Sequence, residues 1–170
     1  PKILGYDGLG TVVEVGDKVS HFEVGDEVYY AGDISRSGSN AMYQLMDERI
    51  VGKKPKTLSA AEAVALPLTG LTAWEAICDR MKVDPKADNG KSILILAGAG
   101  GVGSIAIQIA KQIAGLTVIA TASRDETERW CKSMGADHVV NHHELKTSLK
   151  QVGFKEVDYV LDCVDINGYW

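Results

Sequence analysis

Apolar and polar residues alternate over the first third of the chain, which predicts β structure. Residues 10–30 are rich in β-branched side chains, as strands usually are. Two Val-Gly-Asp-x-Val segments, Val15–Val19 and Val24–Val28, punctuate this region, and each glycine is expected to supply the positive φ of a tight turn. Residues 31–40 predict a loop, and residues 41–50 return to a strand-like pattern. We therefore expect a small barrel or curved sheet.

The pattern changes at Ser59, where helical spacing begins. Ser59 is followed three residues later by Glu62, a capping-box pattern that opens a short apolar helix. Pro67 is expected to close that helix. A second helix is predicted from about Thr69 to Met81, because its apolar residues recur every three or four positions.

From Lys91 onward, short apolar runs alternate with amphipathic stretches. Such an alternation is typical of a parallel sheet covered by helices on both faces. The strands are predicted at 92–97, 116–121, 138–140 and 157–163, and the helices at about 102–114, 125–134 and 144–151. We therefore expect an α/β fold with a β domain over residues 1–58. Linking helices and a partial, doubly wound parallel sheet then occupy residues 59–170.

A glycine-rich segment lies between the first strand and first helix of that sheet. It reads Gly98-Ala99-Gly100-Gly101-Val102-Gly103, the G-x-G-x-x-G spacing of a dinucleotide-binding βαβ unit. Gly98 would permit the turn off the strand, Gly100 the approach of a diphosphate, and Gly103 close packing of the helix. A purely structural glycine turn is the alternative. A nucleotide-triphosphate loop is excluded, because Ser104 stands where that loop needs lysine.

The residues after the second predicted strand favour NADP(H) over NAD(H). A free ribose 2′-hydroxyl is usually met there by Asp or Glu, whereas a 2′-phosphate needs a hydroxyl and a cation. Ser123 and Arg124 occupy this place, and the first acid is Asp125. Ser123 would donate to the phosphate, and Arg124 would pair with it. The alternative is that Ser123 caps the next helix and Arg124 is a solvated surface residue.

Composition excludes several other classes of protein. The net charge is -5 and the 18 Lys and Arg residues are scattered, so nucleic acid is a poor partner. Three widely spaced cysteines suggest neither disulfides nor a thiolate zinc site, and fit free thiols in a reducing cytosol. No apolar run approaches the roughly 20 residues needed to cross a bilayer. We expect a cytoplasmic protein without a membrane partner, and a chain that is part of a longer one.

Four segments together resemble the medium-chain dehydrogenase/reductase superfamily: residues 5–10, the paired Val-Gly-Asp-x-Val segments, residues 66–74 and residues 97–104. Residues 29–33 and 136–140 are similar to its zinc-independent, quinone oxidoreductase-like branch. The resemblance implies a partial GroES-like β domain followed by a partial Rossmann domain. It also implies an active site in the cleft between them and a homodimeric full-length protein.

Departures from the zinc alcohol dehydrogenases of this superfamily predict that no metal is bound. Their Gly-His-Glu motif, whose histidine ligates zinc, is replaced by Gly5-Tyr6-Asp7, and a phenol does not readily replace imidazole on Zn²⁺. The four-cysteine structural lobe is also missing, since no cysteine precedes Cys78. Without a Lewis acid, dehydrogenation of a simple alcohol is disfavoured. A quinone or α,β-unsaturated carbonyl is easier to reduce, because its conjugation already spreads the incoming charge.

The resemblance adds two candidate cofactor-binding residues. Thr72 matches a position near the nicotinamide, and its alternative role is that of an ordinary helix residue. His142 stands in place of a tyrosine that contacts the adenosine phosphate. A metal site at His142-His143-Glu144 is disfavoured, because adjacent residues on a helix face different directions. Cys163 is interpreted as a core thiol rather than a nucleophile.

These observations predict an oxidoreductase that transfers hydride from NADPH to a quinone or α,β-unsaturated carbonyl without zinc. No catalytic acid or base is assigned. A non-catalytic NADPH-binding or sensing protein is one alternative, and a zinc-dependent alcohol dehydrogenase is another.

Overall fold

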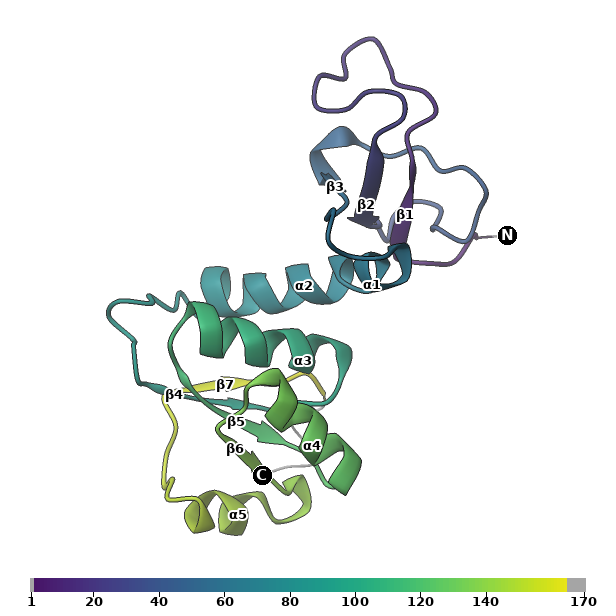
Figure 1. The fold of residues 1–170 in the computed structure, drawn as a ribbon. Coiled ribbons are helices and arrows are strands. Elements are labelled where there is room, and N and C mark those ends of the chain that lie inside the picture. The colour runs from purple at the N-terminus through teal and green to yellow at the C-terminus, as the bar shows by residue number, and fades with distance from the viewer. Residues whose placement is uncertain (1, 165–170) are drawn as a thin grey trace. The chain divides into compact units, whose positions relative to one another are not determined.

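The computed structural model describes residues 2–164, which form two compact units that divide between Thr69 and Gly70 (Figure 1). The division falls later than residue 58 because helix α1 (Ala60–Val64) packs against strand β1 (Asp7–Thr11) of the first unit. The domain limits of 1–58 and 59–170 expected from the sequence remain a prediction.

The first unit contains a three-stranded antiparallel sheet in the order β1-β2-β3. Strand β2 is Glu27–Ala31 and strand β3 is Val51–Lys53. The predicted β structure over 10–30 is confirmed at its two ends, and the segment between β1 and β2 is irregular. Gly25 has φ +100° as predicted, whereas Gly16 is not among the residues of positive φ. The expectation for Gly16 was therefore wrong.

Two tyrosines of β2 lie across glycines of the neighbouring strands. Tyr30 pairs with Gly8, and Tyr29 pairs with Gly52. A Cβ on Gly8 would lie 2.6 Å from Tyr30 Cε2, and one on Gly52 would lie 2.9 Å from Tyr29 Cε1. The glycines therefore leave room for the two aromatic rings, which a side chain at either position would displace.

The strand predicted over residues 41–50 was wrong. That segment is irregular until a 3-10 turn, η1 (Glu48–Ile50), which Asp47 caps by accepting a hydrogen bond from the Arg49 N–H. Met42 and Leu45 are 91% and 82% exposed. Alternation favours a strand only where one face can be buried, and these side chains pack on no such face among the described residues.

Helix α1 begins where its capping box predicts, whereas helix α2 (Pro67–Trp74) begins before the predicted start at about Thr69. Ser59 and Glu62 form the predicted capping box of α1. Pro67 does not close α1, which ends at Val64, but opens α2, since proline has no N–H to lose at a first helical position. The second helix continues as a π-helical segment, η2 (Glu75–Arg80), close to the predicted end.

The second unit contains a four-stranded parallel sheet in the order β6-β5-β4-β7. The strands are β4 (Ser92–Ile95), β5 (Thr117–Thr121), β6 (His138–Val140) and β7 (Tyr159–Leu161). The connecting helices are α3 (Gly101–Gln108), which continues as the π-helical η3 (Ile109–Ile113), then α4 (Asp125–Met134), and, after the 3-10 turn η4 (His142–Glu144), α5 (Leu145–Gln151). The doubly wound α/β prediction is confirmed.

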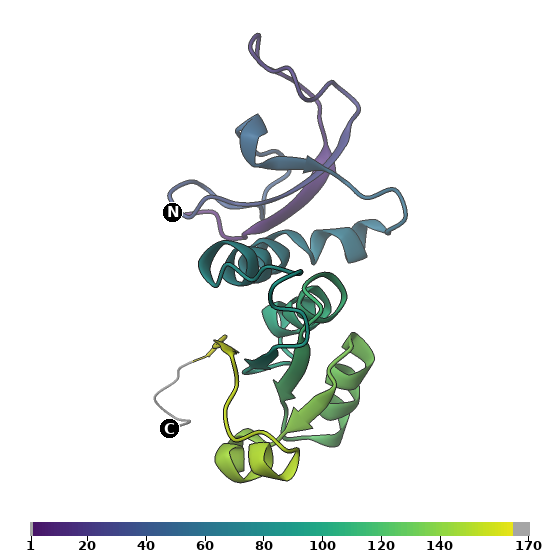
Figure 2. The same ribbon diagram turned by 90° about the vertical axis from the view of Figure 1, so that its left-hand side faces the viewer.

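Successive residues of β4 face opposite layers of helices. Ile93 and Ile95 belong to the larger core, with residues of α2, α3 and α4, and Leu94 belongs to a smaller core against α5. Figure 2 shows α3 and α5 on opposite sides of the strands. Burial on both faces explains why β4 is a continuous apolar run rather than an alternating one.

Candidate cofactor-binding site

The glycine-rich segment joins the carboxyl end of β4 to α3 and is anchored to the end of β5. The Ala97 N–H donates to Thr121 Oγ1 at 2.9 Å, and the Gly98 N–H donates to the Thr121 carbonyl at 3.1 Å. Ala97 itself adopts φ +52°, an uncommon conformation for a residue with a side chain. Ala97 is therefore the residue of positive φ in the turn that follows β4, and Gly98 lies in the same turn.

Gly98 and Gly103 are required by packing within the protein. A Cβ on Gly98 would lie 2.7 Å from the Ala120 Cβ and 3.1 Å from the Cys131 sulfur. A Cβ on Gly103 would lie 2.8 Å from both the Cα and the carbonyl oxygen of Gly98. The close helix–strand approach expected at Gly103 is present, and Gly98 provides a second one against β5 and α4.

Gly100 is different, because its backbone does not require glycine and its neighbours leave more room than those of Gly98 and Gly103. It caps α3 with φ -73° and ψ 172°, which any residue can adopt. Among the described residues, and apart from its own chain neighbours, an added Cβ would meet one heavy atom within 4 Å, the Ala97 carbonyl oxygen, in a tight contact at 3.2 Å. Apart from this contact, the space beside Gly100 is open at the amino end of a helix.

The amino end of α3 can hold an anion. The first N–H groups of a helix have no partner within it, and they carry the positive end of the helix dipole. Gly101 and Val102 present such groups beside the open face of Gly100. A diphosphate would receive hydrogen bonds from these N–H groups with no side chain in its way, so the residues present fit the group that the sequence predicts.

Ser123 and Arg124 follow β5, and both side chains are exposed. They line a hollow of about 280 Å³ at the carboxyl ends of β5 and β6. The other residues that line it are Ala122, Asp125, Glu128, Val139, Val140, Asn141, Ser148, Gln151 and Val152. Arg124, not Ser123, is the N-cap residue of α4, and its N–H donates to Thr127 Oγ1 at 3.3 Å. Ser123 is therefore not the helix cap of the alternative interpretation.

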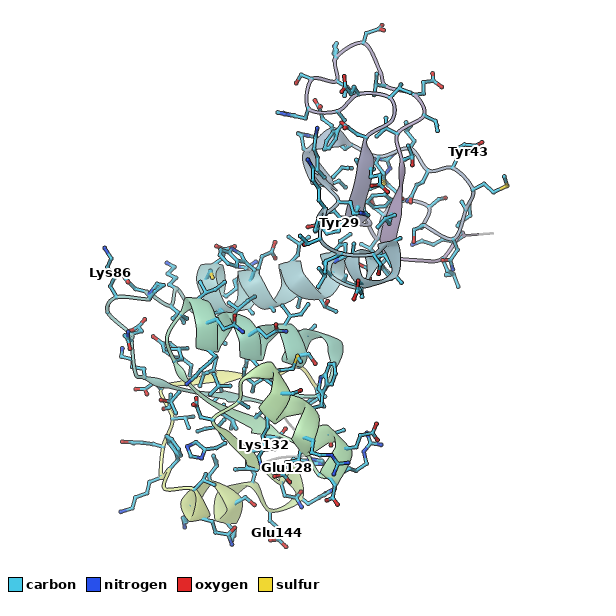
Figure 3. All side chains as sticks on the ribbon, viewed as in Figure 1. Tyr29, Tyr43, Lys86, Glu128, Lys132 and Glu144 are labelled. Atoms are coloured by element: carbon cyan, nitrogen blue, oxygen red, sulfur yellow. The ribbon has the colours of Figure 1, made fainter. Side chains whose placement is uncertain are left out.

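Two acidic residues, Glu128 and Asp125, also line this hollow. Glu128 is paired with Lys132 on the same helix at 2.5 Å, and Figure 3 shows the two side chains side by side. Asp125 is the first residue of α4, where a carboxylate stabilises the helix dipole.

A second hollow, of about 520 Å³, opens beside the glycine-rich segment. Ala99 and Arg124 both line it, together with Glu126, Thr127, Arg129, Trp130 and Ser133. Arg124 thus borders both hollows, the one beside the glycine-rich segment and the one at the carboxyl ends of β5 and β6. Sequence analysis missed Trp130 and Arg129, since nothing in their spacing marks them as neighbours of a loop thirty residues earlier in the chain.

His142 and Thr72 lie outside the residues that line these two hollows. His142 is half-buried in η4 and stacks on His143 with ring centroids 4.0 Å apart. Burial, and then the charge of His143, lower the pKa of His142. The preceding Asn141 lines the smaller hollow instead. Thr72 is exposed on α2, next to the buried Ala73, so both assignments remain predictions.

The three cysteines and the segment that replaces the Gly-His-Glu motif make contacts within the protein. All three cysteines are free thiols, and burial raises the pKa of Cys131 and of Cys163. Asp7, in the segment that replaces Gly-His-Glu, accepts a hydrogen bond from the Leu68 N–H at 2.8 Å through Oδ1. Among residues 2–164, no three His, Cys, Asp or Glu side chains form a cluster that could hold a metal ion. Within the same range, no helix has the length and apolar character needed to span a membrane.

Two family models match most of the chain. Residues 1–75 match the alcohol dehydrogenase GroES-like domain, and residues 101–169 match the zinc-binding dehydrogenase domain. Together with the fold, these matches show that the chain belongs to the medium-chain dehydrogenase/reductase superfamily of oxidoreductases. The GroES-like and Rossmann-like domains expected from the sequence are confirmed.

The chain is similar to several curated proteins. It is 52% identical to a zinc-type alcohol dehydrogenase-like protein of Staphylococcus aureus, covering 100% of this chain and 51% of that protein. A 2-methylene-furan-3-one reductase of Solanum lycopersicum is 43% identical over 84% of the chain and 37% of its own length. A chloroplastic NADPH-dependent alkenal/one oxidoreductase of Arabidopsis thaliana is 38% identical over 96% and 42%. The chain spans about half the length, or less, of these relatives.

Solved structures share the fold. A protein of Rhizobium etli described as a zinc-dependent alcohol dehydrogenase has a TM-score of 0.92 and 52% identity over 99% of this chain and 50% of its own. The quinone oxidoreductase of Coxiella burnetii has a TM-score of 0.83 and 36% identity, with the same coverage. A mycobacterial protein complexed with NADPH has a TM-score of 0.80 and 30% identity over 94% and 49%.

Proposed function

We propose that the full-length protein reduces a quinone or an α,β-unsaturated carbonyl with NADPH and without zinc. The observation that carries the proposal is the open face of Gly100 at the amino end of α3, beside the hollow that Arg124 lines. Internal packing is much tighter at Gly98 and Gly103 than at Gly100, which supports a close approach by a ligand as the reason for the third glycine.

Each part of the site has a task in holding the cofactor. The N–H groups of Gly101 and Val102 donate to the diphosphate, and the helix dipole stabilises its charge. Arg124 pairs with the 2′-phosphate, and Ser123 donates a hydrogen bond to it. Thr72 lies near the nicotinamide, and His142 contacts the adenosine phosphate. When bound, NADPH supplies the hydride, and the protein contributes position and electrostatics.

The substrate class is supported by relatives and by the segment that replaces the zinc-binding motif. The printed names of two relatives describe reduction of enone-type substrates, and a similar structure is a quinone oxidoreductase. Tyr6 stands where zinc enzymes have histidine, and the Asp7 carboxylate is engaged by the first turn of α2. A conjugated carbonyl needs only a hydrogen-bond donor to accept hydride, which suits a site without a Lewis acid.

The test is NADPH oxidation by the full-length protein against a panel of quinones, enones, aldehydes and simple ketones. We expect turnover with quinones or enones that a chelator leaves unchanged. Turnover confined to aldehydes and simple ketones, lost on chelation, would instead show a zinc alcohol dehydrogenase. Saturable NADPH binding with no turnover on any substrate would show a binding or sensing protein. The same preparation tests the expected homodimer, by its mass in solution, and cell fractionation tests the expected cytoplasmic location.

The preference for NADPH is tested separately with Arg124→Ala. Loss of a charge-assisted contact to phosphate costs about 1.5–3 kcal/mol, or a ten- to hundredfold weaker affinity. The affinity for NADPH should fall by that factor, whereas the affinity for NADH should change little. Arg80→Ala removes an exposed arginine at the end of η2 and is the matched control. Equal affinities of the parent for both cofactors would refute the NADPH assignment.

A further inference from the structure

A chain of side-chain hydrogen bonds leads from α4 to the open glycine. The Trp130 indole N–H donates to Ser104 Oγ at 2.8 Å, and Ser104 Oγ donates to the Gly100 carbonyl at 2.7 Å. The Ser104 N–H donates to the same carbonyl at 2.8 Å. Trp130 is therefore connected through one hydroxyl to the residue at the amino end of α3.

The Gly100 carbonyl sets the direction of a neighbouring donor. The carbonyl of Gly100 and the N–H of Gly101 belong to one planar trans peptide, in which the two groups point in opposite directions. Holding the carbonyl toward α3 therefore turns the Gly101 N–H outward, toward the space in which a diphosphate would lie. The bonds from Ser104 hold the carbonyl in that direction.

The surroundings of Trp130 favour a functional role for this contact. The side chain is 48% exposed, so it contributes less to the core than a buried tryptophan would. Its ring lines the hollow of about 520 Å³ that Ala99 of the glycine-rich segment also lines. A serine hydroxyl can rotate freely in water, and the indole N–H removes that freedom by occupying one lone pair of Ser104.

We propose that Trp130 is a positioning residue for the diphosphate of the nicotinamide cofactor, acting through Ser104 on the Gly100–Gly101 peptide. The inference rests on the proposed function, because it concerns the same cofactor site. It assigns a role to a side chain of α4 that need not touch the cofactor itself.

The experiment uses the full-length protein with Trp130→Phe, Ser104→Ala and the double variant. Phenylalanine keeps an aromatic ring but removes the donor. Each single variant should weaken NADPH binding about two- to tenfold, the range of a single hydrogen bond. The double variant should have the same affinity for NADPH as whichever single variant binds it less tightly, because the two substitutions break the same chain of contacts. KM for the substrate and kcat should stay within about twofold, since the reacting groups are untouched.

The matched control is Trp74→Phe, which changes a tryptophan of α2 that is 45% exposed. It should bind NADPH like the parent. The amide signal of Gly101 in the cofactor-free protein should move in Trp130→Phe and stay in place in Trp74→Phe, a readout that requires no cofactor.

Three results would overturn the inference. Parent-like NADPH affinity in Trp130→Phe would show that the indole does not position the site. Additive losses in the double variant would show that Trp130 and Ser104 act independently. An equal loss in Trp74→Phe would show a general effect on the fold. If the parent itself does not bind NADPH, the proposed function fails first, and the Gly101 signal still reports whether Trp130 controls that peptide.

Discussion

Gly103→Ala tests the packing of α3 against the turn that follows β4. The added methyl group would lie 2.8 Å from two backbone atoms of Gly98 and close to the Ala97 carbonyl. Overpacking costs about 1–3 kcal/mol, and backbone neighbours cannot rotate away, which favours the upper half of that range. Alanine recovers up to about 1 kcal/mol of helix propensity over glycine. The net loss in the free energy of unfolding should be about 1–2 kcal/mol.

The assay is urea unfolding followed by far-ultraviolet circular dichroism, with Gly70→Ala as the control. Gly70 is also a helical glycine, but an added Cβ meets no atom within 4 Å. Propensity alone acts there, so Gly70→Ala should leave stability unchanged or raise it by up to about 1 kcal/mol. The urea midpoint should therefore fall in Gly103→Ala and stay unchanged or rise in Gly70→Ala.

A midpoint for Gly103→Ala at or above that of the parent would refute the reasoning, because propensity would then outweigh the contact. A loss for Gly70→Ala equal to that for Gly103→Ala would also refute it, since the surroundings of the two glycines would then not matter.

Three further changes test the described contacts, each by the urea midpoint. Gly98→Ala should destabilise by about 1–3 kcal/mol, because its Cβ would lie 2.7 Å from that of Ala120; a parent-like midpoint would contradict this. Asp7→Ala should lower the free energy of unfolding by about 1 kcal/mol, because it removes the cap of α2. Asp7→Asn keeps an acceptor oxygen and should retain most of the stability of the parent. Equal losses in the two variants would contradict the capping role. The hydrogen bond from Lys91 holds the pKa of the Asp88 carboxyl at about 2, below its ordinary 3.8. Its stabilising contribution is complete above pH 3.8 and is lost as the pH falls toward 2. The parent should therefore lose more stability over that window than Asp88→Asn, and parallel curves would show that this charge contributes nothing.

The parallel sheet could be predicted well from the sequence because each of its elements has a local cause. Buried parallel strands are continuous apolar runs, and helix α4 was predicted with its observed bounds, Asp125–Met134. Gly135, at φ +110°, ends that helix in a left-handed conformation. Local propensity and tertiary packing agree along this part of the chain, so pattern and structure coincide.

The first unit was less predictable because its strands depend on partners distant in sequence. The alternation over residues 41–50 resembles a strand, yet the segment finds no neighbour to pair with among the described residues. At the candidate site, the packing partners of Gly98 could not be predicted for a similar reason. Its need for a small side chain comes from Ala120 and Cys131, which only the folded sheet brings beside it. The hydrogen bond between Trp130 and Ser104 likewise joins two helices whose contact no local pattern reveals.

The most direct test of the proposed function is calorimetric titration of NADPH into the full-length protein and its Gly100→Val variant. The variant places a branched side chain on the open face of Gly100, where the backbone is already extended, so it should remain folded. We predict saturable binding to the parent and none to the variant at the same concentrations. Equal binding by a folded Gly100→Val variant would contradict the account, because the diphosphate would then not approach this glycine.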